Sequence, residues 1–212
     1  MHLAEIWRYP VKSMAGERLE SAVVTENGIL GDRIVQVYDA HGHVATSRTY
    51  PGLLGLHASI NDDGLPLVNG KPWNAPDILE AVRKIVGPGA TLEFNDSPER
   101  FDILPLLIAT DGTIQAFGRD SRRLRPNLII GGVPGLAERE WQGRKLTIGD
   151  VQIGVHDLRG RCVMTTYDPD TLVQDLSVLR DIAKRFQGKL ALNCEVLQGG
   201  TLEIGSAVIL SS

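Results

Sequence analysis

Short apolar runs, each soon interrupted by glycine, proline or asparagine, follow one another along most of the chain. In the first half, this pattern predicts strands at Leu3–Arg8, Glu17–Thr25 and Arg33–Asp39. The Asn27-Gly28 pair lies between two of these runs and favours a hairpin turn, because both residue types readily adopt positive φ. Short strands separated by such turns are typical of a β-barrel or a β-sandwich.

The second half of the chain continues this pattern. Its predicted strands are Ile103–Ala109, Leu128–Ile130, Lys145–Ile148, Val151–Val155, Cys162–Thr166, Leu190–Leu197 and Leu202–Leu210. We expect the first of them to be buried, because almost all of its residues are apolar. The chain contains no internal repeat and no low-complexity segment, so we expect a β-rich globular fold.

A few segments have helical periodicity instead. Apolar residues recur at helical spacing from residue 76 to 86, after Asn74 as a cap and Pro76 as an early helical residue, and Gly87-Pro88 ends the helix. A second amphipathic helix is predicted over residues 176–186, closed by Gly188. Thr110 is a candidate N-cap for a third, short helix. The fold class is therefore mixed α/β and β-rich, with a few helices.

The segment Gly87–Asp102 is the least hydrophobic long stretch of the sequence and is our candidate domain boundary. We expect a small β-barrel-like domain over residues 1–95 and a second β-rich domain over residues 96–212. A chain of 212 residues is long enough for two compact domains of this kind.

Composition narrows the functional classes. The apolar fraction of 42% is enough for a real core, and 22 basic against 26 acidic residues give a net charge of −4, which disfavours general nucleic-acid binding. No apolar run approaches the roughly 20 residues that cross a bilayer, and the first residues lack the layout of a secretory signal. We therefore expect a cytoplasmic protein that binds neither nucleic acid nor membranes.

The densest polar cluster lies between Gly118 and Asn127 and contains four arginines, at positions 119, 122, 123 and 125. A guanidinium group presents a planar fork of donors that suits phosphate and other multidentate anions. The alternative is a solvated loop in which residues such as Asp120 form local ion pairs with the arginines. Both interpretations remain open at this point.

The second cluster is Arg159-Gly160-Arg161-Cys162. Nearby positive charge favours the thiolate form of a cysteine, which makes it a better nucleophile or metal ligand. The alternative is that Cys162 is a small buried hydrophobic residue, as free cysteines commonly are. For Cys194, in the middle of a predicted strand, we expect a core position.

A third candidate is the Lys12-Ser13 pair, which follows the first predicted strand. A lysine and a serine in a turn can bind phosphate, but the glycine-rich frame that precedes the lysine of a phosphate loop is absent.

Taken together, these segments resemble the MOSC family, which is named for the C-terminal domain of molybdenum-cofactor sulfurases. The matching segments, in the family's order, are Tyr9-Pro10-Val11-Lys12-Ser13, Gly31-Asp32-Arg33, Thr46-Ser47-Arg48, Leu106–Asp111, Arg125-Pro126-Asn127-Leu128, Arg161–Thr166, Asp168-Pro169-Asp170 and Gly200–Gly205. They span nearly the whole chain. The resemblance is closer to the two-part form of the family, to which the mitochondrial amidoxime-reducing component and its bacterial relatives belong.

The resemblance implies a β-barrel N-terminal domain, a β-barrel MOSC domain and a pterin-based molybdenum cofactor (molybdopterin) between them. It implies that Cys162 ligates molybdenum, with Arg161 and Asp168 as further catalytic residues. The implied cofactor-binding residues are Lys12, Ser13, Arg33, Arg48, Thr110, Asp111, Arg125, Asn127, Arg159 and Asn193. A soft thiolate is a reasonable donor to a heavy transition metal, and lysine and arginine suit the phosphate of the cofactor.

The reaction implied by the resemblance is a two-electron oxygen-atom transfer at molybdenum that reduces N-hydroxylated compounds or N-oxides. Two cysteines cannot ligate a four-cysteine iron–sulfur cluster, and no flavin or nicotinamide fingerprint is visible, so we expect a separate redox protein as electron donor. No segment is long enough for a pyridoxal-phosphate domain, and we expect none of that cofactor.

Two alternatives remain at the level of the sequence. In the first, the protein transfers sulfur through a persulfide on Cys162 or carries the cofactor to other enzymes. In the second, the arginine-rich segment forms a non-catalytic anion-binding module.

Overall fold

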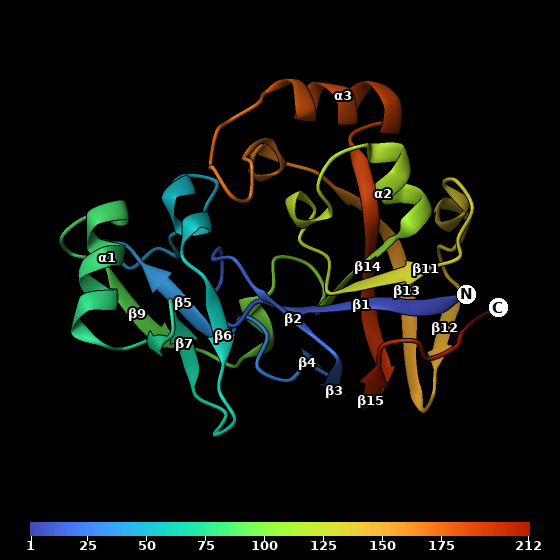
Figure 1. Ribbon diagram of the computed structural model, residues 1–212, viewed down its shortest axis with the longest axis horizontal. Coiled ribbons are helices and arrows are strands. Elements are labelled where there is room, and N and C mark those ends of the chain that lie inside the picture. The colour runs from blue at the N-terminus through green and yellow to red at the C-terminus, as the bar shows by residue number, and fades with distance from the viewer.

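Eight strands form the main sheet of the computed structural model, which describes residues 1–212 (Figure 1). These strands are β1 (His2–Arg8), β2 (Glu17–Leu19), β10 (Leu106–Thr110), β11 (Leu128–Gly131), β12 (Lys145–Ile148), β13 (Val151–Gly160), β14 (Lys189–Gln198) and β16 (Val208–Ser211). Their order is β16-β12-β13-β14-β10-β11-β1-β2. Only β10 and β11 pair in parallel, and the connection between them contains helix α2 (Asp111–Phe117).

The core of this larger lobe contains residues from both ends of the chain. Strand β1 has an irregularity in its pairing between Leu3 and Glu5, and this bulge lets Leu3 and Ile6 both face the core although they are three residues apart. A three-stranded sheet of β15 (Gly200–Glu203), β3 (Ser21–Thr25) and β4 (Gly28–Ile29) covers part of the same core.

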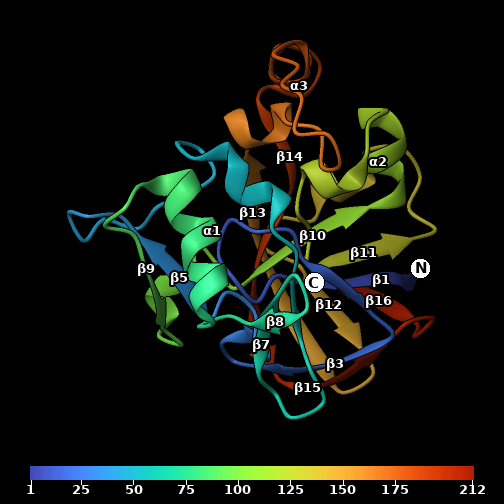
Figure 2. The same cartoon turned by 60° about the vertical axis from the view of Figure 1, so that its left-hand side comes forward.

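The smaller lobe is also built mainly from β-strands. Its sheets are the pair β5 (Val35–Tyr38) and β9 (Thr91–Phe94) and the three strands β6 (Ala58–Ile60), β7 (Pro66–Val68) and β8 (Lys71–Pro72). Helix α1 (Pro76–Val86) packs Ile78 and Val82 into a core of twelve buried residues. Figure 2, in which this lobe comes forward, shows the helix beside the strands of the lobe.

The third helix, α3 (Ser177–Phe186), lies above the main sheet (Figure 1) and packs against α2. Six buried residues form this contact, and one of them is the fully buried Leu124. Because Leu124 lies between Arg123 and Arg125, this small core fixes the arginine-rich segment next to the sheet. The five 3-10 turns are η1 (Pro51–Gly55), η2 (Pro98–Arg100), η3 (Ser121–Arg123), η4 (Ala137–Glu140) and η5 (Val163–Thr166).

The β-rich class with two parts and a few helices is confirmed. The predicted helices at residues 76–86 and 176–186 are present, and Thr110 caps α2 by accepting a hydrogen bond from the Thr113 N–H. Asn74 makes no cap, because α1 begins at Pro76 with Ala75 before it. None of the helices is both long and apolar enough to cross a membrane.

Several strand predictions were wrong in detail. Glu17–Thr25 forms two strands in different sheets, Ile103 lies outside β10 and is 55% exposed, and Leu202–Leu210 is divided between β15 and β16. Residues 163–166 form a 3-10 turn rather than a strand.

The division of the chain at residue 95 stays a prediction. In the structure, part of the sequence before residue 95 belongs to the larger lobe. Residues 2–29 supply strands and core residues to the larger lobe, together with residues 106–211. The core of the smaller lobe is formed by Val11, Met14 and members of residues 35–90. The chain therefore leaves the larger lobe after β1, returns to it at β2 and leaves it again after β4.

Candidate functional site

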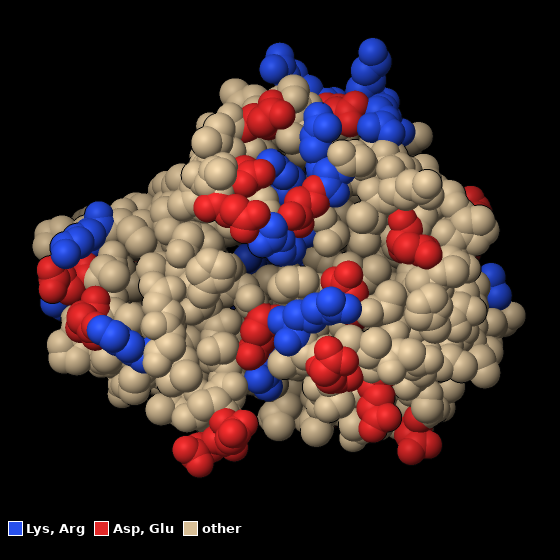
Figure 3. Space-filling model, in the orientation of Figure 1, with Lys and Arg blue, Asp and Glu red and all other residues tan.

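A cavity of about 410 Å³ lies where the two lobes meet. It is at one end of the main sheet, where β1 and β13 end and β10 and β11 begin. Seven cationic side chains line it, namely Lys12, Arg33, Arg48, Arg123, Arg125, Arg159 and Arg161, and Asp102 is the one carboxylate among its lining residues. Figure 3 shows Lys and Arg side chains gathered at this junction, with acidic side chains beside them.

Lys12 and Ser13 come from the loop that leaves β1. The Lys12 N–H donates to the Val35 carbonyl (2.9 Å), which ties this loop to the smaller lobe. The Lys12 ammonium donates to the Arg100 carbonyl (2.8 Å) and lies 3.0 Å from a carboxylate oxygen of Asp102. Ser13 has a φ of 72°, so the chain turns sharply here and both side chains reach the cavity.

A fully buried carboxylate, Asp32, holds the two lobes together under the cavity. It accepts hydrogen bonds from the Tyr9 N–H (2.7 Å) and the Asn127 side-chain amide (3.1 Å), and it forms an ion pair with Arg33. The side-chain carbonyl of Asn127 accepts from the Leu107 N–H (3.1 Å). Both the oxygen and the nitrogen of the Asn127 side-chain amide are therefore already hydrogen-bonded within the protein, although the residue lines the cavity.

Arg125 reaches the cavity with no carboxylate within 4.0 Å of its guanidinium. Its φ of 54° turns the chain, and its side chain lies over the Tyr9 ring at 4.3 Å from the ring centroid. Burial lowers the pKa of Arg125 to about 10 and raises the pKa of Tyr9 to about 12. No side-chain hydrogen bond within the protein satisfies this guanidinium, so it is free to bind an anion from the cavity.

Arg161, which also lines the cavity, has a similar character. One of its terminal nitrogens donates to the Leu124 carbonyl (2.7 Å), but its Nε is buried and has no hydrogen-bond partner. Burial lowers the pKa of Arg161 to about 10, and no carboxylate forms an ion pair with it. Buried polar groups without partners are rare in native proteins and are commonly explained by a ligand, an ion or a water molecule.

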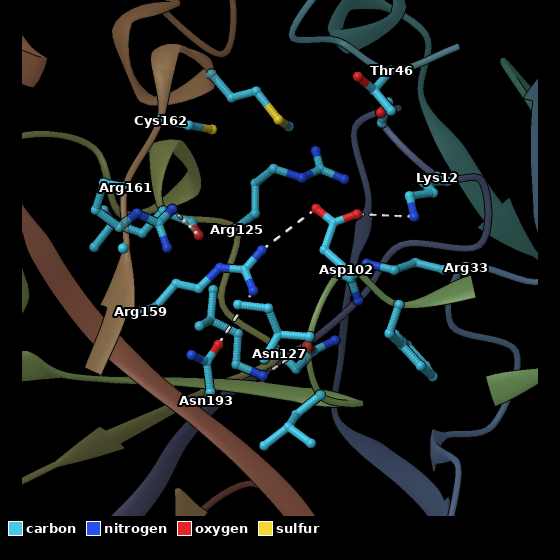
Figure 4. A pocket seen from close by; sticks show the side chains of 18 of the residues that line it. Lys12, Arg33, Thr46, Asp102, Arg125, Asn127, Arg159, Arg161, Cys162 and Asn193 are labelled. Carbon is cyan, nitrogen blue, oxygen red and sulfur yellow. Dashed lines mark hydrogen bonds and ion pairs between the residues drawn. The ribbon is translucent and has the colours of Figure 1, made fainter. Parts of the chain in front are cut away.

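Cys162 follows Arg161 directly and is half-buried. Its carbonyl accepts hydrogen bonds from the Thr165 N–H (3.1 Å) and the Thr165 hydroxyl (2.9 Å), so the turn after β13 fixes the cysteine backbone. Figure 4 shows its sulfur directed into the cavity, close to Arg161. Cys194, in contrast, is fully buried in β14, where burial raises the pKa of its thiol, as expected for a core residue.

Arg159 is oriented by two neighbours. One terminal nitrogen donates to the Asn193 side-chain carbonyl (3.3 Å), and the other lies 3.4 Å from Asp102. Asn193 in turn donates to Asp157 (2.7 Å), which fixes its own orientation. Asn193 therefore acts on the cavity by positioning Arg159, whose pKa is lowered by burial.

Asp102 was not identified from the sequence. It forms ion pairs with Lys12, Arg48 and Arg159. Figure 4 shows Asp102 between Lys12 and Arg159. Burial by itself would raise the pKa of Asp102, but the three cations outweigh this effect and hold the pKa below its usual value. Nothing in the local sequence marks this residue, because its partners are distant along the chain and it lies in a polar stretch that looked like a linker.

Two predicted cofactor-binding residues do not reach the cavity. Thr110 is fully buried, caps α2 and donates to Glu138 (3.2 Å). Asp111 accepts from the N–H groups of Gly132 (2.7 Å) and Val133 (3.0 Å) and so holds the turn after β11. Both residues therefore lie outside this cavity, at the opposite end of β10 and β11, and their expected role in cofactor binding stays a prediction.

Asp168, the third predicted residue outside the cavity, forms an ion pair with Arg123 (2.9 Å) and accepts hydrogen bonds within its own turn. It reaches the cavity only through Arg123, and its expected catalytic role stays a prediction. In the arginine-rich segment, Arg122 pairs with Asp120 and Asp170 at the surface. Arg122 therefore fits the interpretation of a solvated loop with local ion pairs, whereas anion binding by the arginines that line the cavity stays a prediction.

The geometry fits an anionic cofactor that carries its own metal ligands. Two guanidinium groups without carboxylate partners, those of Arg125 and Arg161, line the cavity together with the half-buried thiol of Cys162. No group of three or more His, Cys, Asp or Glu side chains could hold a bare metal ion by itself. A metal at Cys162 would therefore take its other ligands from the molecule that brings it.

Comparison of the sequence with known protein families finds matches to two domains. The MOSC N-terminal beta barrel domain matches residues 1–80, and the MOSC domain matches residues 113–209. The chain belongs to the MOSC-domain family. Membership of this family associates the chain, at the family level, with the molybdenum cofactor and N-reductive chemistry.

Two curated relatives in this family illustrate the likeness. The mitochondrial amidoxime-reducing component 1 of Mus musculus is 24% identical over 98% of this chain and 82% of its own length. The corresponding protein of Homo sapiens is 25% identical over the same shares. Among solved structures, the YUAD protein from Bacillus subtilis has the same fold, with a TM-score of 0.55 and 12% identity over 100% of this chain and 96% of its own.

Proposed function

We propose that this MOSC protein binds a molybdenum-containing pterin cofactor in the cavity between its lobes and reduces N-hydroxylated compounds or N-oxides. The observation that carries the proposal is the pair of guanidinium groups, Arg125 and Arg161, that face the cavity beside Cys162 without a carboxylate partner. An uncompensated charge inside a protein is costly, so its presence at a cavity is best explained by an anionic ligand.

In this proposal, the residues divide into three groups by position. Lys12, Ser13 and Arg125 bind the anionic end of the cofactor. Lys12 and Ser13 reach the cavity from the loop that is tied to the smaller lobe, and Arg125 reaches it over the Tyr9 ring. Cys162 provides the thiolate ligand to the metal from the opposite wall. Arg33, Asn127 and Asn193 are already bonded within the protein, and they hold the walls of the cavity in place.

When bound, the cofactor supplies the two-electron chemistry that accepts the oxygen atom of the substrate. The protein contributes charge and orientation. Arg161 and Arg159 keep positive charge beside Cys162, and Arg159 presents donors that can bind the oxygen of the substrate.

The electrons require a separate redox protein. The second cysteine, Cys194, is fully buried in β14 and makes only a weak contact with the Leu192 carbonyl, so it offers no route for electrons through a thiol. We propose a partner that docks transiently and that supplies two electrons per turnover. We further propose a cytoplasmic location for the protein.

The alternative that a specific observation favours is sulfur transfer or cofactor delivery. Cys162 is half-buried, and the positive charges of Arg159 and Arg161 beside it would also stabilise the anion of a persulfide on this residue. This alternative needs no electron donor and no metal in the isolated protein.

Metal analysis combined with an activity assay separates these functions. Protein made in a host that synthesises the cofactor should contain close to one molybdenum per chain and reduce an amidoxime when supplied with a reductant. Cys162→Ser should abolish the activity, whereas the matched control Cys194→Ala should retain both metal and activity.

Wild type without metal but with sulfur releasable from Cys162 would contradict the reductase and support sulfur transfer. Metal without reductase activity under any electron donor would support cofactor delivery instead. A simple anion-binding module would contain no metal and would be insensitive to Cys162→Ser.

A further inference from the structure

The carboxylate of Asp102 lies where an anionic ligand of the cavity would bind. It forms ion pairs with Lys12 (3.0 Å) and Arg48 from one lobe and with Arg159 (3.4 Å) from the other. No other carboxylate pairs with these three cations. The same cations would be expected to receive an incoming anion, because all three line the cavity. Figure 4 shows Lys12 and Arg159 on opposite sides of Asp102.

The loop that carries this carboxylate is held to the protein mainly by the ion pairs. Residues 102–104 neither donate nor accept a backbone hydrogen bond, and Ile103 is 55% exposed. The preceding residues are anchored firmly, because the Arg100 side chain donates to the carbonyls of Asp32 (3.0 Å), Asn27 (2.9 Å) and Ser97 (2.9 Å). The loop can therefore move at Asp102 while its base stays in place.

The cavity has more positive charge than Asp102 can neutralise, so it can also bind an anionic ligand. Arg33 and Arg123 have their own carboxylates, Asp32 and Asp168. Five cations remain for Asp102 alone, namely Lys12, Arg48, Arg125, Arg159 and Arg161. An anion that enters the cavity gains from this excess charge but must compete with Asp102 for three of the five.

We propose that Asp102 sets the anion selectivity of the cavity by acting as an internal competitor for Lys12, Arg48 and Arg159. A simple carboxylate or another monoanion offers these cations no more than Asp102 already does, and so it does not displace the loop. A phosphoryl group, with more charge and more acceptor oxygens, does displace it. This inference rests on the anion-binding cavity of the proposed function and adds a determinant of which anions enter it.

Calorimetric titration of the full-length protein, made without the cofactor, tests this proposal. The probes are inorganic pyrophosphate and acetate at pH 7 and low ionic strength. Asp102→Asn should bind pyrophosphate about tenfold more tightly than wild type or better, because a like charge has been removed from beside the ligand. It should also bind acetate, which wild type should not.

Three variants control the measurement. Asp102→Glu keeps the competing carboxylate and should behave like wild type. Asp181→Asn removes the same charge from an Asp–Arg pair on α3, where it pairs with Arg185 at 2.8 Å, and should leave both titrations unchanged. Asp102→Ser carries the same expectation as Asp102→Asn and replaces it if the asparagine variant does not fold.

The outcomes separate this inference from the proposed function. Equal or weaker pyrophosphate binding by Asp102→Asn and Asp102→Ser would overturn the role of Asp102 alone and leave it as a residue that orients Arg159. Absence of pyrophosphate binding in wild type and in all variants would overturn the anion cavity, and both proposals with it.

Discussion

At the scale of single residues, the cavity is defined by charges that the protein leaves without partners. Arg125 is the clearest case, because it makes no side-chain hydrogen bond and no ion pair, and its main contact is the face of Tyr9. Such a group costs free energy in the ligand-free protein and contributes binding energy when an anion arrives. Stability and binding should therefore respond in opposite directions when the charge is removed.

Arg125→Met tests this opposition. Methionine keeps the bulk over Tyr9 but removes the buried charge, so the free energy of unfolding of the ligand-free protein should rise by about 1 kcal/mol. Pyrophosphate binding should weaken about tenfold, because one charge-assisted contact is lost. Urea unfolding and calorimetry measure the two effects. A variant that is less stable and binds with unchanged affinity would contradict this assignment.

Asp102 gives a prediction for the pH dependence of stability. Burial alone would raise its pKa, yet Lys12, Arg48 and Arg159 hold it below the usual value of about 3.9. A carboxyl group of this kind stabilises the folded state above its unfolded pKa and loses that contribution as pH falls through its folded pKa. Wild type should therefore exceed Asp102→Asn in free energy of unfolding by about 1 kcal/mol at pH 7, because the side chain is one-third exposed. The difference should vanish as the pH falls below 4. A difference that persists at low pH would show that the ion pairs are not its cause.

At the scale of elements, hydrogen bonds from side chains to the nearby backbone determine whether a short apolar segment forms a strand or a turn. The run Cys162–Thr166 has the apolar and β-branched content of a strand, which predicted one. The hydroxyls of Thr165 and Thr166 instead donate back to the carbonyls of Cys162 (2.9 Å) and Val163 (2.6 Å), which favours a 3-10 turn. The helices were easier to predict, because their periodicity and caps are both local.

Thr110→Ala tests the structural assignment of the α2 cap. The hydroxyl of Thr110 accepts from the Thr113 N–H (3.0 Å) and donates to Glu138, so its loss should lower the free energy of unfolding by about 1–2 kcal/mol. Thr110→Ser keeps both bonds and should be nearly neutral. Neither change should alter pyrophosphate affinity. A loss of affinity in the alanine variant at full folding would return Thr110 to the binding site.

At the scale of the whole molecule, the site exists because the chain brings distant segments together. Residues 12–13, 123–125 and 159–162 meet at one cavity, and Asp102 joins them from the segment that separates the two halves of the sequence. Motifs predicted most of these residues, since Lys12, Arg125 and Cys162 each belong to a recognisable segment. Asp102 and the passage of residues 2–29 into the larger lobe could not be predicted, because non-local pairing leaves no local signal.

The buried Asp32 should control how firmly the lobes are held together. Asp32→Ala leaves Arg33 without its carboxylate and removes the acceptor for Tyr9 and Asn127, so the free energy of unfolding should fall by about 3–5 kcal/mol. Asp39→Ala, on an exposed turn, is a control for loss of an aspartate and should cost far less. Denaturant unfolding measures both. A cost for Asp32→Ala no larger than that of the control would contradict the bridging role.

X-ray absorption at the molybdenum edge tests the central claim most directly, with wild type and Cys162→Ser made in a cofactor-competent host. The account predicts that wild type contains molybdenum with a sulfur neighbour supplied by Cys162. In Cys162→Ser, that neighbour should be lost, or the metal itself should be absent. The control Cys194→Ala should give the wild-type spectrum. Molybdenum present in Cys162→Ser with an unchanged number of sulfur neighbours, or absent from wild type, would contradict the account.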